Sequence, residues 1–319
     1  MARSIIIDTD PGIDDALAIM LAAASPEVDI IGITAVAGNT GLEHTTRNAA
    51  GLADLVGLTC PIGSGAAAPL WRRDTEPATH VHGDDGLRGY LLPPSTRQVE
   101  PAIELLRRLV DESTEPVTLV PIGPLTNIAL FMATYPETAR KVEHIVLMGG
   151  GTGEHLGNAT PAAEFNIYFD PDAAAKVFEF GVPITMVGLN VTNRALVASR
   201  DFAPLVESGG PIADIVSAIM LPYIAHANSG GDGDEAAAAQ HDPLALAAVI
   251  QPDLLKTEHL YVDVENVGRL TSGMTVVDHN SVTGNKPNCH VAVDLDVKGF
   301  KTLLVNRLTE LDRILKQDD

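Results

Sequence analysis

Four aspartates lie within eight residues near the N-terminus, in the stretch DTDPGIDD that covers residues 8–15. They follow the β-branched run Ser4–Asp8, which predicts a buried strand that ends where the acids begin. Like charges packed this closely raise one another's pKa and destabilise a fold, so capping and solvation account for only one or two of them. A bound cation resolves the conflict. Because the donors are all oxygens, the cluster favours a hard ion such as Ca²⁺ or Mg²⁺.

The neighbouring elements place this cluster at one edge of a sheet. After a Pro-Gly turn, Ala16–Ala24 predicts a helix and Val28–Val36 a second strand, which together form a βαβ unit. In an open α/β sheet, ligands bind outside the carboxyl ends of the strands. Asp10 would lie in the turn, whereas Asp14 and Asp15 would begin the helix with side chains about 100° apart. One of that pair can therefore reach a metal while the other faces a ligand.

Strands and helices continue to alternate along the chain. The further helices that the pattern predicts are Thr45–Val56, Pro101–Glu112, Leu125–Ala133, Pro171–Phe180, Ile212–Ala227, Leu244–Ile250 and Lys298–Lys316. The further strands that it predicts are Val117–Pro121, Ile145–Met148, Pro183–Leu189, Leu260–Val264 and His290–Asp296. This order predicts an α/β fold with a Rossmann-like core, in which helices flank a mostly parallel central sheet.

We expect a single domain over residues 1–319, with a flexible loop near 228–240. The sequence there, NSGGDGDEAAAA, is rich in glycine and acidic residues and is typical of a surface loop. Because it directly precedes the pair His241 and Asp242, a lid over a ligand site is the alternative interpretation.

Composition narrows the class of protein further. Asp and Glu number 42 against 21 Lys and Arg, a formal charge of −21, and such a surface repels a phosphate backbone. Cys60 and Cys289 are far apart, have no zinc-ligand spacing and suit a reducing compartment. No apolar run approaches the roughly 18 residues that span a bilayer. We expect a cytoplasmic protein that binds a small molecule, with no nucleic-acid or membrane partner.

Four motifs occur along the chain in a set order. They are DTDPGIDDA at 8–16, GPLTN at 123–127, GNATPAAEFN at 157–166 and HDP at 241–243. Together they resemble the inosine-uridine-preferring nucleoside hydrolase family over roughly residues 4 to 310. The resemblance implies a nucleoside hydrolase-like fold and a homodimer or homotetramer. It also implies Ca²⁺-dependent hydrolysis of the N-glycosidic bond of ribonucleosides, which gives ribose and a free nucleobase.

The resemblance implies one Ca²⁺ held by Asp10, Asp15, Asp242 and the backbone carbonyl of Thr126. Ca²⁺ takes 6–8 oxygen ligands, so these groups leave positions for a water and two vicinal hydroxyls. Ribose offers such a pair at 2′ and 3′, whereas deoxyribose does not. Asp10 is then the predicted general base, which removes a proton from the attacking water.

The same resemblance assigns the contacts to the sugar. Asp14 and Asn166, assisted by Asp242, would bind the 2′ and 3′ hydroxyls, and Asn158 and Glu164 the 5′ hydroxyl. Carboxylates and amides suit this work because each hydroxyl needs both a donor and an acceptor.

Around the nucleobase, His241 is the predicted leaving-group contact and possible proton donor, since it adjoins a metal ligand. His82 and Phe165 are predicted to line the base pocket, and Asn39 to orient groups near the reacting face. Tyr223 could also line the pocket and is left unassigned. The motifs do not distinguish purine from pyrimidine nucleosides.

Two alternatives stay open. An aspartate-dependent phosphatase would explain the DxD of Asp8 and Asp10, but that class needs a lysine to balance phosphate charge, and no basic cluster accompanies a second motif. A non-catalytic nucleoside or ribose sensor on the same scaffold would be expected to lack Asp10 or the leaving-group histidine, and both are present.

Overall fold

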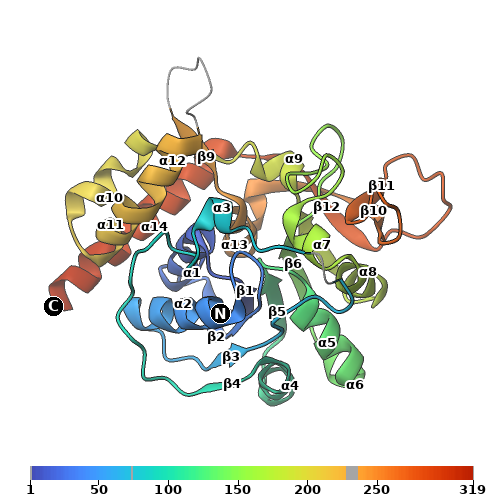
Figure 1. Ribbon diagram of the computed structural model, residues 1–319, viewed down its shortest axis with the longest axis horizontal. Coiled ribbons are helices and arrows are strands. Elements are labelled where there is room, and N and C mark those ends of the chain that lie inside the picture. The colour runs from blue at the N-terminus through green and yellow to red at the C-terminus, as the bar shows by residue number, and fades with distance from the viewer. Residues whose placement is uncertain (1, 73–74, 228–235, 319) are drawn as a thin grey trace.

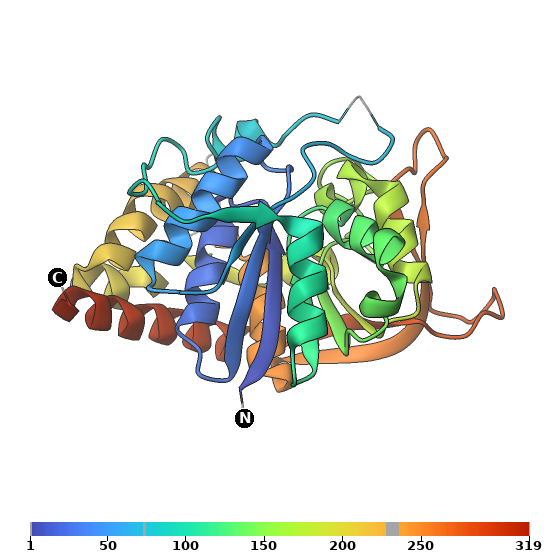
Figure 2. The ribbon, with the colours of Figure 1, turned by 90° about the horizontal axis from the view of Figure 1, so that it is seen from below.

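The computed structural model describes residues 2–72, 75–227 and 236–318 (Figure 1). Within these ranges, ten strands form one sheet in the order β11-β10-β12-β7-β6-β5-β1-β2-β3-β4, with helices packed around it (Figures 1 and 2). Neighbouring strands are parallel except at β10, which runs antiparallel to both β11 and β12. The predicted α/β fold with a mostly parallel central sheet is confirmed.

The strands of the large sheet are β1 Arg3–Thr9, β2 Val28–Ala35, β3 Ile62–Ser64, β4 Val99–Pro101, β5 Val117–Pro121, β6 His144–Met148, β7 Ile184–Val187, β10 Leu255–Glu265, β11 Met274–Asp278 and β12 Cys289–Leu295. A separate antiparallel pair consists of β8 Leu196–Ala198 and β9 Ala237–Ala239. The short strands β3 and β4 were not predicted, because three residues carry too little pattern to be recognised.

The α-helices are α1 Ile13–Ala23, α2 Leu42–Leu55, α3 Thr79–His82, α4 Ala102–Glu112, α5 Thr126–Thr134, α6 Pro136–Ala139, α7 Phe165–Phe169, α8 Pro171–Glu179, α9 Leu189–Thr192, α10 Ala203–Ser208, α11 Pro211–Ile215, α12 Leu221–Ala227, α13 His241–Ile250 and α14 Val297–Asp318. Two 3₁₀ segments cover Ser199–Phe202 and Pro252–Leu254, and a π-helical segment covers Val216–Met220. The single helix predicted over 212–227 is therefore interrupted by that π-helical turn.

The central strand β1 is buried on both faces of the sheet. Ile5 and Ile7 belong to the core that contains α1 and α13, whereas Ile6 belongs to the core that contains α4 and α5. A strand covered on both sides reads as a continuous apolar run, which is why the sequence there shows no polar alternation. The same burial fixes the carboxyl end of β1, where the acidic motif begins.

Helices α1 and α13 pack against each other on one face of the sheet (Figure 1). Both are apolar almost all round: in α13, Leu244 and Leu246 lie on different sides, and both are fully buried. Because the acids at the starts of the two helices converge, Asp14 and Asp242 are neighbours although 228 residues separate them.

The structure tests only the last part of the loop expected near 228–240. Residues 228–235 lie outside the described residues. The alanine run Ala237–Ala239, expected to belong to the loop, is instead the strand β9, whose backbone pairs with β8. Alanine has little strand preference of its own, so this pairing comes from tertiary context. None of the described helices combines the length and the apolar character needed to cross a membrane.

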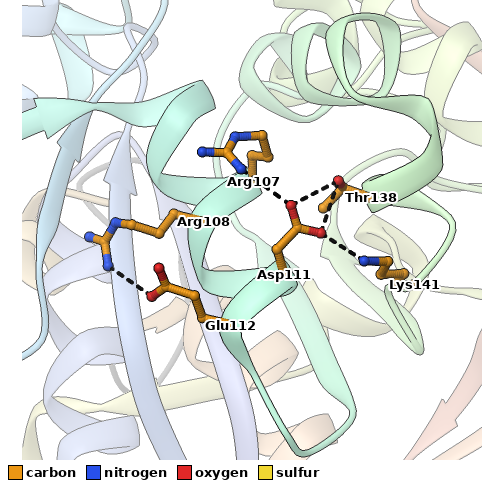
Figure 3. Close-up of polar contacts among 6 residues, drawn as sticks. All are labelled: Arg107, Arg108, Asp111, Glu112, Thr138 and Lys141. Atoms are coloured by element: carbon orange, nitrogen blue, oxygen red, sulfur yellow. Dashed lines mark hydrogen bonds and ion pairs between the residues drawn. The ribbon is translucent and has the colours of Figure 1, made fainter.

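On the far face of the sheet, α4 is tied to α6 by a surface network (Figure 3). The Asp111 carboxylate accepts hydrogen bonds from Thr138 Oγ1 at 3.1 Å and from Lys141 Nζ at 2.8 Å. Arg107 Nη1 lies 3.3 Å from the same carboxylate, one turn earlier on α4. The hydrogen bond from Lys141, joined by charge from both cations, lowers the pKa of Asp111.

Candidate active site

A cavity of about 490 Å³ opens beside the carboxyl ends of the central strands. Its walls come from the start of α1, the end of β5, α3, α7, α12 and the start of α13. Nine of the residues predicted from the sequence line it: Asp14, Asn39, His82, Asn158, Glu164, Phe165, Asn166, His241 and Asp242. The fold thus gathers residues from three of the four motifs, together with Asn39 and His82, into one place, as the strand-end rule for α/β sheets requires.

Three carboxylates come together at this cavity, which Asp14 and Asp242 line and beside which Asp15 is buried. Asp14, Asp15 and Asp242 each offer an oxygen, and these oxygens lie within 4.8 Å of one another. Asp15 is held in place because its Oδ1 accepts from Thr9 Oγ1 at 2.6 Å and its Oδ2 from the Gly12 amide at 2.9 Å. The latter bond caps the start of α1.

Asp10 sits beside this group in a cradle made of two glycines. A Cβ added to Gly38 would lie 2.0 Å from Asp10 Oδ2, and one added to Gly123 would lie 2.5 Å from Oδ1. The backbone amide of Asn39 donates to Asp10 Oδ2 at 2.6 Å, and its side-chain Nδ2 donates to Asp15 Oδ2 at 3.0 Å. Asn39 therefore fixes two of the acids relative to each other, besides lining the cavity.

The electrostatics of the cluster are unfavourable without a cation. Burial raises the pKa of Asp10 well above its ordinary value, and the charge of Asp15 raises it further. Burial, followed by the charges of Asp14, Asp15 and Asp10, does the same to the pKa of Asp242. Burial raises the pKa of Asp14 and of Asp15 to about 6. In the described part of the chain no lysine or arginine lines the cavity, so a bound cation fits the donor set.

Asp8, the first acid of the motif, lies in the sheet and does not join the cluster. Its Oδ1 accepts from Thr34 Oγ1 at 2.5 Å and from Asn127 Nδ2 at 2.7 Å, and burial raises its pKa to about 7. Asn127 also donates to the carbonyl of Ala35 at 3.0 Å. The pair of Asp8 and Asn127 therefore joins the ends of β1 and β2 to the start of α5, next to the acids that follow.

The structure does not bring Thr126 to the cavity. Thr126 is the first residue of α5, and its hydroxyl donates to Asp170 Oδ2 at 2.7 Å. The backbone position that does line the cavity is Ile122, at the end of β5, whose carbonyl accepts from Asn166 Nδ2 at 2.9 Å. The position of a backbone carbonyl depends on the path of the chain and not on residue type, so no residue pattern marks Ile122.

The amide of Asn166 has a fixed orientation. Its Nδ2 donates to the carbonyls of Ile122 and Met148, at 2.9 and 3.1 Å. Because carbonyl oxygens only accept hydrogen bonds, the end of the side-chain amide that faces them must be the nitrogen. Its Oδ1 is therefore free to accept a hydrogen bond from a ligand hydroxyl. Asn166 thus combines a rigid setting with an available acceptor.

Glu164 caps the short helix α7. Its carboxylate accepts from the amides of Asn166 at 2.9 Å, Gly150 at 3.0 Å and Ile167 at 3.2 Å. Burial nevertheless outweighs these bonds and raises the pKa of Glu164 to about 7. Asn158, which is exposed, accepts from the Phe165 amide at 2.9 Å and so holds the loop before α7 against the helix start.

Two imidazoles also line the cavity, and each has its Nδ1 engaged in a hydrogen bond. His82 Nδ1 accepts from the Ile13 amide at 3.1 Å, which joins α3 to the start of α1 (Figure 1). His241 Nδ1 lies 2.8 Å from Thr192 Oγ1. Burial lowers the pKa of His82 to about 3 and that of His241 to about 4, so neither ring carries a charge at neutral pH.

Aromatic and loop residues complete the cavity. Phe165 is half-buried there, with its ring centroid 5.8 Å from that of Phe169. Tyr223, to which the sequence analysis assigned no role, lines the cavity from α12. Tyr168 lines it from α7. Exposed positions of the segment before α3, such as Glu76, also line it, and nothing in their sequence distinguished them from an ordinary surface loop.

Comparison with known proteins decides the family. The family model of the inosine-uridine preferring nucleoside hydrolases matches residues 5–302. This chain belongs to that family. The chain is therefore a ribonucleoside hydrolase of a metal-dependent family. With this family assignment, we reject both the phosphatase and the non-catalytic sensor.

Individual relatives agree. The pyrimidine-specific ribonucleoside hydrolase RihA of Citrobacter koseri is 46% identical over 314 residues, which cover 97% of this chain and 98% of the relative. RihA of Escherichia coli is 45% identical over 311 residues, 97% and 99% of the two chains. Among solved structures, a purine-preferring ribonucleoside hydrolase from Gardnerella vaginalis superposes with a TM-score of 0.91 at 32% identity, covering 98% of this chain and 100% of that one. A plant nucleoside hydrolase superposes with a TM-score of 0.88 at 34% identity, covering 97% and 99%.

Proposed function

We propose that this ribonucleoside hydrolase is Ca²⁺-dependent and acts on pyrimidine ribonucleosides, releasing ribose and a free base. The observation that carries the proposal is the convergence of Asp14, Asp15 and Asp242 within 4.8 Å, beside a cavity that Asp14, Asp242, His82 and His241 line. The base preference is supported by the names of the relatives at 45–46% identity, which are pyrimidine-specific. The purine-preferring relative is more distant, at 32% identity.

The ion would be held by Asp10, Asp15, Asp242 and one backbone carbonyl. Asp10 and Asp15 do not line the cavity themselves, but both bond Asn39, which does. We place the carbonyl at Ile122, which lines the cavity, and not at Thr126, which does not line it and bonds Asp170. An all-oxygen donor set of this kind suits Ca²⁺. When bound, the ion would supply positive charge that neutralises the acids, orients the ribose hydroxyls and polarises the attacking water.

The side chains then divide the work on the substrate. Asp14 would accept from a ribose hydroxyl, and Asn166 Oδ1 would accept from its neighbour, with the amide already fixed by two carbonyls. Glu164 and Asn158 would face the 5′ end of the sugar. Such rigid placement lowers the entropic part of the barrier, because the reacting groups need no further ordering.

Asp10 is the proposed general base. It is buried among other carboxylates, and its cradle of Gly38 and Gly123 leaves the carboxylate a single position. The proton lost by the attacking water would pass to Asp10 while the C1′–N bond breaks and the ribosyl group develops oxocarbenium character. His241, which lines the same cavity, would contact the departing base.

A homodimer or homotetramer remains a prediction from the resemblance, and a cytoplasmic location remains a prediction from the two isolated cysteines. Both cysteines are buried and unpaired, which removes them from any disulfide within the described residues.

A substrate panel tests the proposal. Uridine, cytidine, inosine, adenosine and guanosine would be incubated with the enzyme, and released reducing sugar measured with and without a strong chelator. We expect kcat/KM for uridine or cytidine to exceed that for each purine nucleoside by at least about tenfold, a modest discrimination for a shaped pocket. A purine nucleoside as the best substrate would overturn the base preference alone. Full activity in chelator, with no metal retained by the protein, would overturn the metal dependence.

A further inference from the structure

Thr192 lies directly behind His241. It ends the short helix α9, is fully buried and is not among the residues that line the cavity. Its Oγ1 lies 2.8 Å from His241 Nδ1. Within the described ranges, that ring nitrogen is the one hydrogen-bond partner of the Thr192 hydroxyl. Among the described residues, the Thr192 hydroxyl therefore makes no hydrogen bond other than this contact with the histidine.

The direction of this hydrogen bond follows from satisfying both groups. A hydroxyl can donate one hydrogen bond, whereas a ring nitrogen of a neutral imidazole is either a donor or an acceptor. If Nδ1 carried the proton, the Thr192 hydroxyl would accept it and leave its own hydrogen buried with no acceptor. If the hydroxyl donates to Nδ1, nothing is left unsatisfied. The second arrangement places the ring proton of His241 on Nε2.

We infer that Thr192 is a positioning residue that holds His241 in the Nε2–H tautomer, so that His241 presents a hydrogen-bond donor to the departing base. Which ring nitrogen carries the proton is set by the bond that the other one makes. The inference deepens the proposed function and rests on it, because it takes His241 to be the residue on the leaving-group side. It makes His241 a neutral donor to the base rather than a full proton donor.

The proposed step balances as follows. The C1′–N1 bond breaks and its electron pair goes to the pyrimidine, while water adds its oxygen to C1′ and loses one proton to Asp10. The Nε2–H of His241 hydrogen-bonds the pyrimidine, with O2 the natural acceptor because the new negative charge spreads onto it from the adjacent N1. The base takes up its proton from solvent after release, and Asp10 returns its proton to solvent.

Two substrates separate this role from a purely structural one. Uridine has a poor leaving group that needs a hydrogen-bond donor, whereas p-nitrophenyl β-D-ribofuranoside releases a stabilised phenolate that needs none. Thr192→Val removes the hydroxyl and keeps the shape of the side chain, and Thr192→Ser keeps the hydroxyl. Thr118→Val is the matched control, because the buried Thr118 hydroxyl in β5 has no partner within the described residues.

We expect Thr192→Val to lower kcat on uridine by about 10- to 100-fold, with KM and the rate on the p-nitrophenyl riboside changing by less than about threefold. Thr192→Ser should restore uridine turnover to within about threefold, and Thr118→Val should match the wild type. Equal losses on the two substrates would show a structural role and overturn the inference. Unchanged turnover of uridine by Thr192→Val would overturn it as well.

A spectroscopic readout tests the tautomer without relying on activity. In protein labelled with ¹⁵N-histidine, the ring signals of His241 would be identified by their loss in His241→Asn. We expect an unprotonated Nδ1 and a protonated Nε2 in the wild type, and a mixture of tautomers in Thr192→Val. A protonated Nδ1 in the wild type would overturn the inference. A wild type that hydrolyses no nucleoside would refute the proposed function, whereas the tautomer would still be decided by this spectrum.

Discussion

Asp111 at the surface and the buried aspartates Asp10 and Asp242 have pKa values shifted in opposite directions. Asp111 is on the surface of α4, and the hydrogen bond from Lys141 lowers its pKa (Figure 3). Asp10 and Asp242 are buried beside other acids, and burial raises the pKa of each. The chain thus provides its own cations for the surface carboxylate, and none lines the cavity in the part of the chain that the structure describes.

This difference in surroundings indicates different roles for the exposed and the buried carboxylates. An exposed ion pair such as that of Asp111 contributes little to stability, because water screens it. Buried like charges oppose folding unless a counter-charge is bound. A cluster retained at that cost fits a functional role, and the missing counter-charge fits a metal ion. The predictions below compare changes in the buried cluster with the same kind of change at the surface.

Removal of the metal should have the largest effect. Treatment with a strong chelator should reduce turnover of uridine to background and lower the Tm, because the buried acids then lose their counter-charge. Ca²⁺ added in excess should restore both. Assays of activity and thermal unfolding, run before and after chelation, check this outcome. An enzyme freed of metal that still turns over at the original rate would contradict the comparison.

The substitution Asp10→Asn should lower kcat by about 10²–10⁴, the range expected for loss of a general base. The side chain keeps its shape, so nucleoside affinity should stay within about tenfold. Asp111→Asn is the matched control, since it makes the same chemical change at the surface. Steady-state kinetics of both variants on uridine give the answer. Equal kcat in Asp10→Asn and wild type would remove Asp10 from its role.

The sugar should be recognised through its hydroxyls. We expect 2′-deoxyuridine to show a kcat/KM lower than that of uridine by about 10² or more, since one ligand hydroxyl is missing and its partners stay unpaired. Competition between the two nucleosides in one reaction, followed by chromatography of the released base, measures the ratio directly. Comparable values for the two would argue against hydroxyl binding at Asp14 and Asn166.

A change next to Asp10 should have a smaller effect than loss of its charge. In Gly123→Ala the added Cβ would lie 2.5 Å from Asp10 Oδ1, so the carboxylate must shift. We expect kcat/KM to fall by about tenfold to 10², because small displacements at a reacting centre are costly. Gly41→Ala is the control, since a Cβ there meets nothing within 4 Å. Kinetics in which the two variants match each other would show that the cradle does not constrain Asp10.

The smallest effect is expected at the surface. Asp111→Asn should leave kcat and KM unchanged and move the Tm by no more than about 2 °C, as for other exposed ion pairs. Differential scanning calorimetry beside the kinetic assay measures both quantities. A loss of activity in this variant would mean that the far face of the sheet is coupled to the site.

The sequence predicted the parts of this protein that depend on residue type. The acids of 10–15 and the pair at 241–242 were recognisable because their side chains carry the charge and the titratable groups of the motifs. The long strands were recognisable because their apolar runs are continuous. The strand Ala237–Ala239 was missed because its pairing is tertiary. Thr126 was assigned from its motif, but the backbone turns into α5 there and its hydroxyl faces Asp170.

Other features of the site carry no local signal at all. Asp8 looks like its neighbours in the sequence, and only the strand geometry turns it toward Asn127 and away from the cavity. The roles that we propose for Thr192 and Ile122 depend on one hydroxyl and one backbone carbonyl, which carry no recognisable sequence pattern. Their roles become visible only when distant elements are placed together.

The most direct test of the metal site is Ca²⁺ binding itself. Isothermal titration of the chelated protein should give one Ca²⁺ per chain in the wild type and in Asp111→Asn, and no binding in Asp15→Asn or Asp242→Asn at the same concentrations. Wild-type protein that binds no Ca²⁺, or binding that survives in Asp15→Asn and Asp242→Asn, would contradict the account.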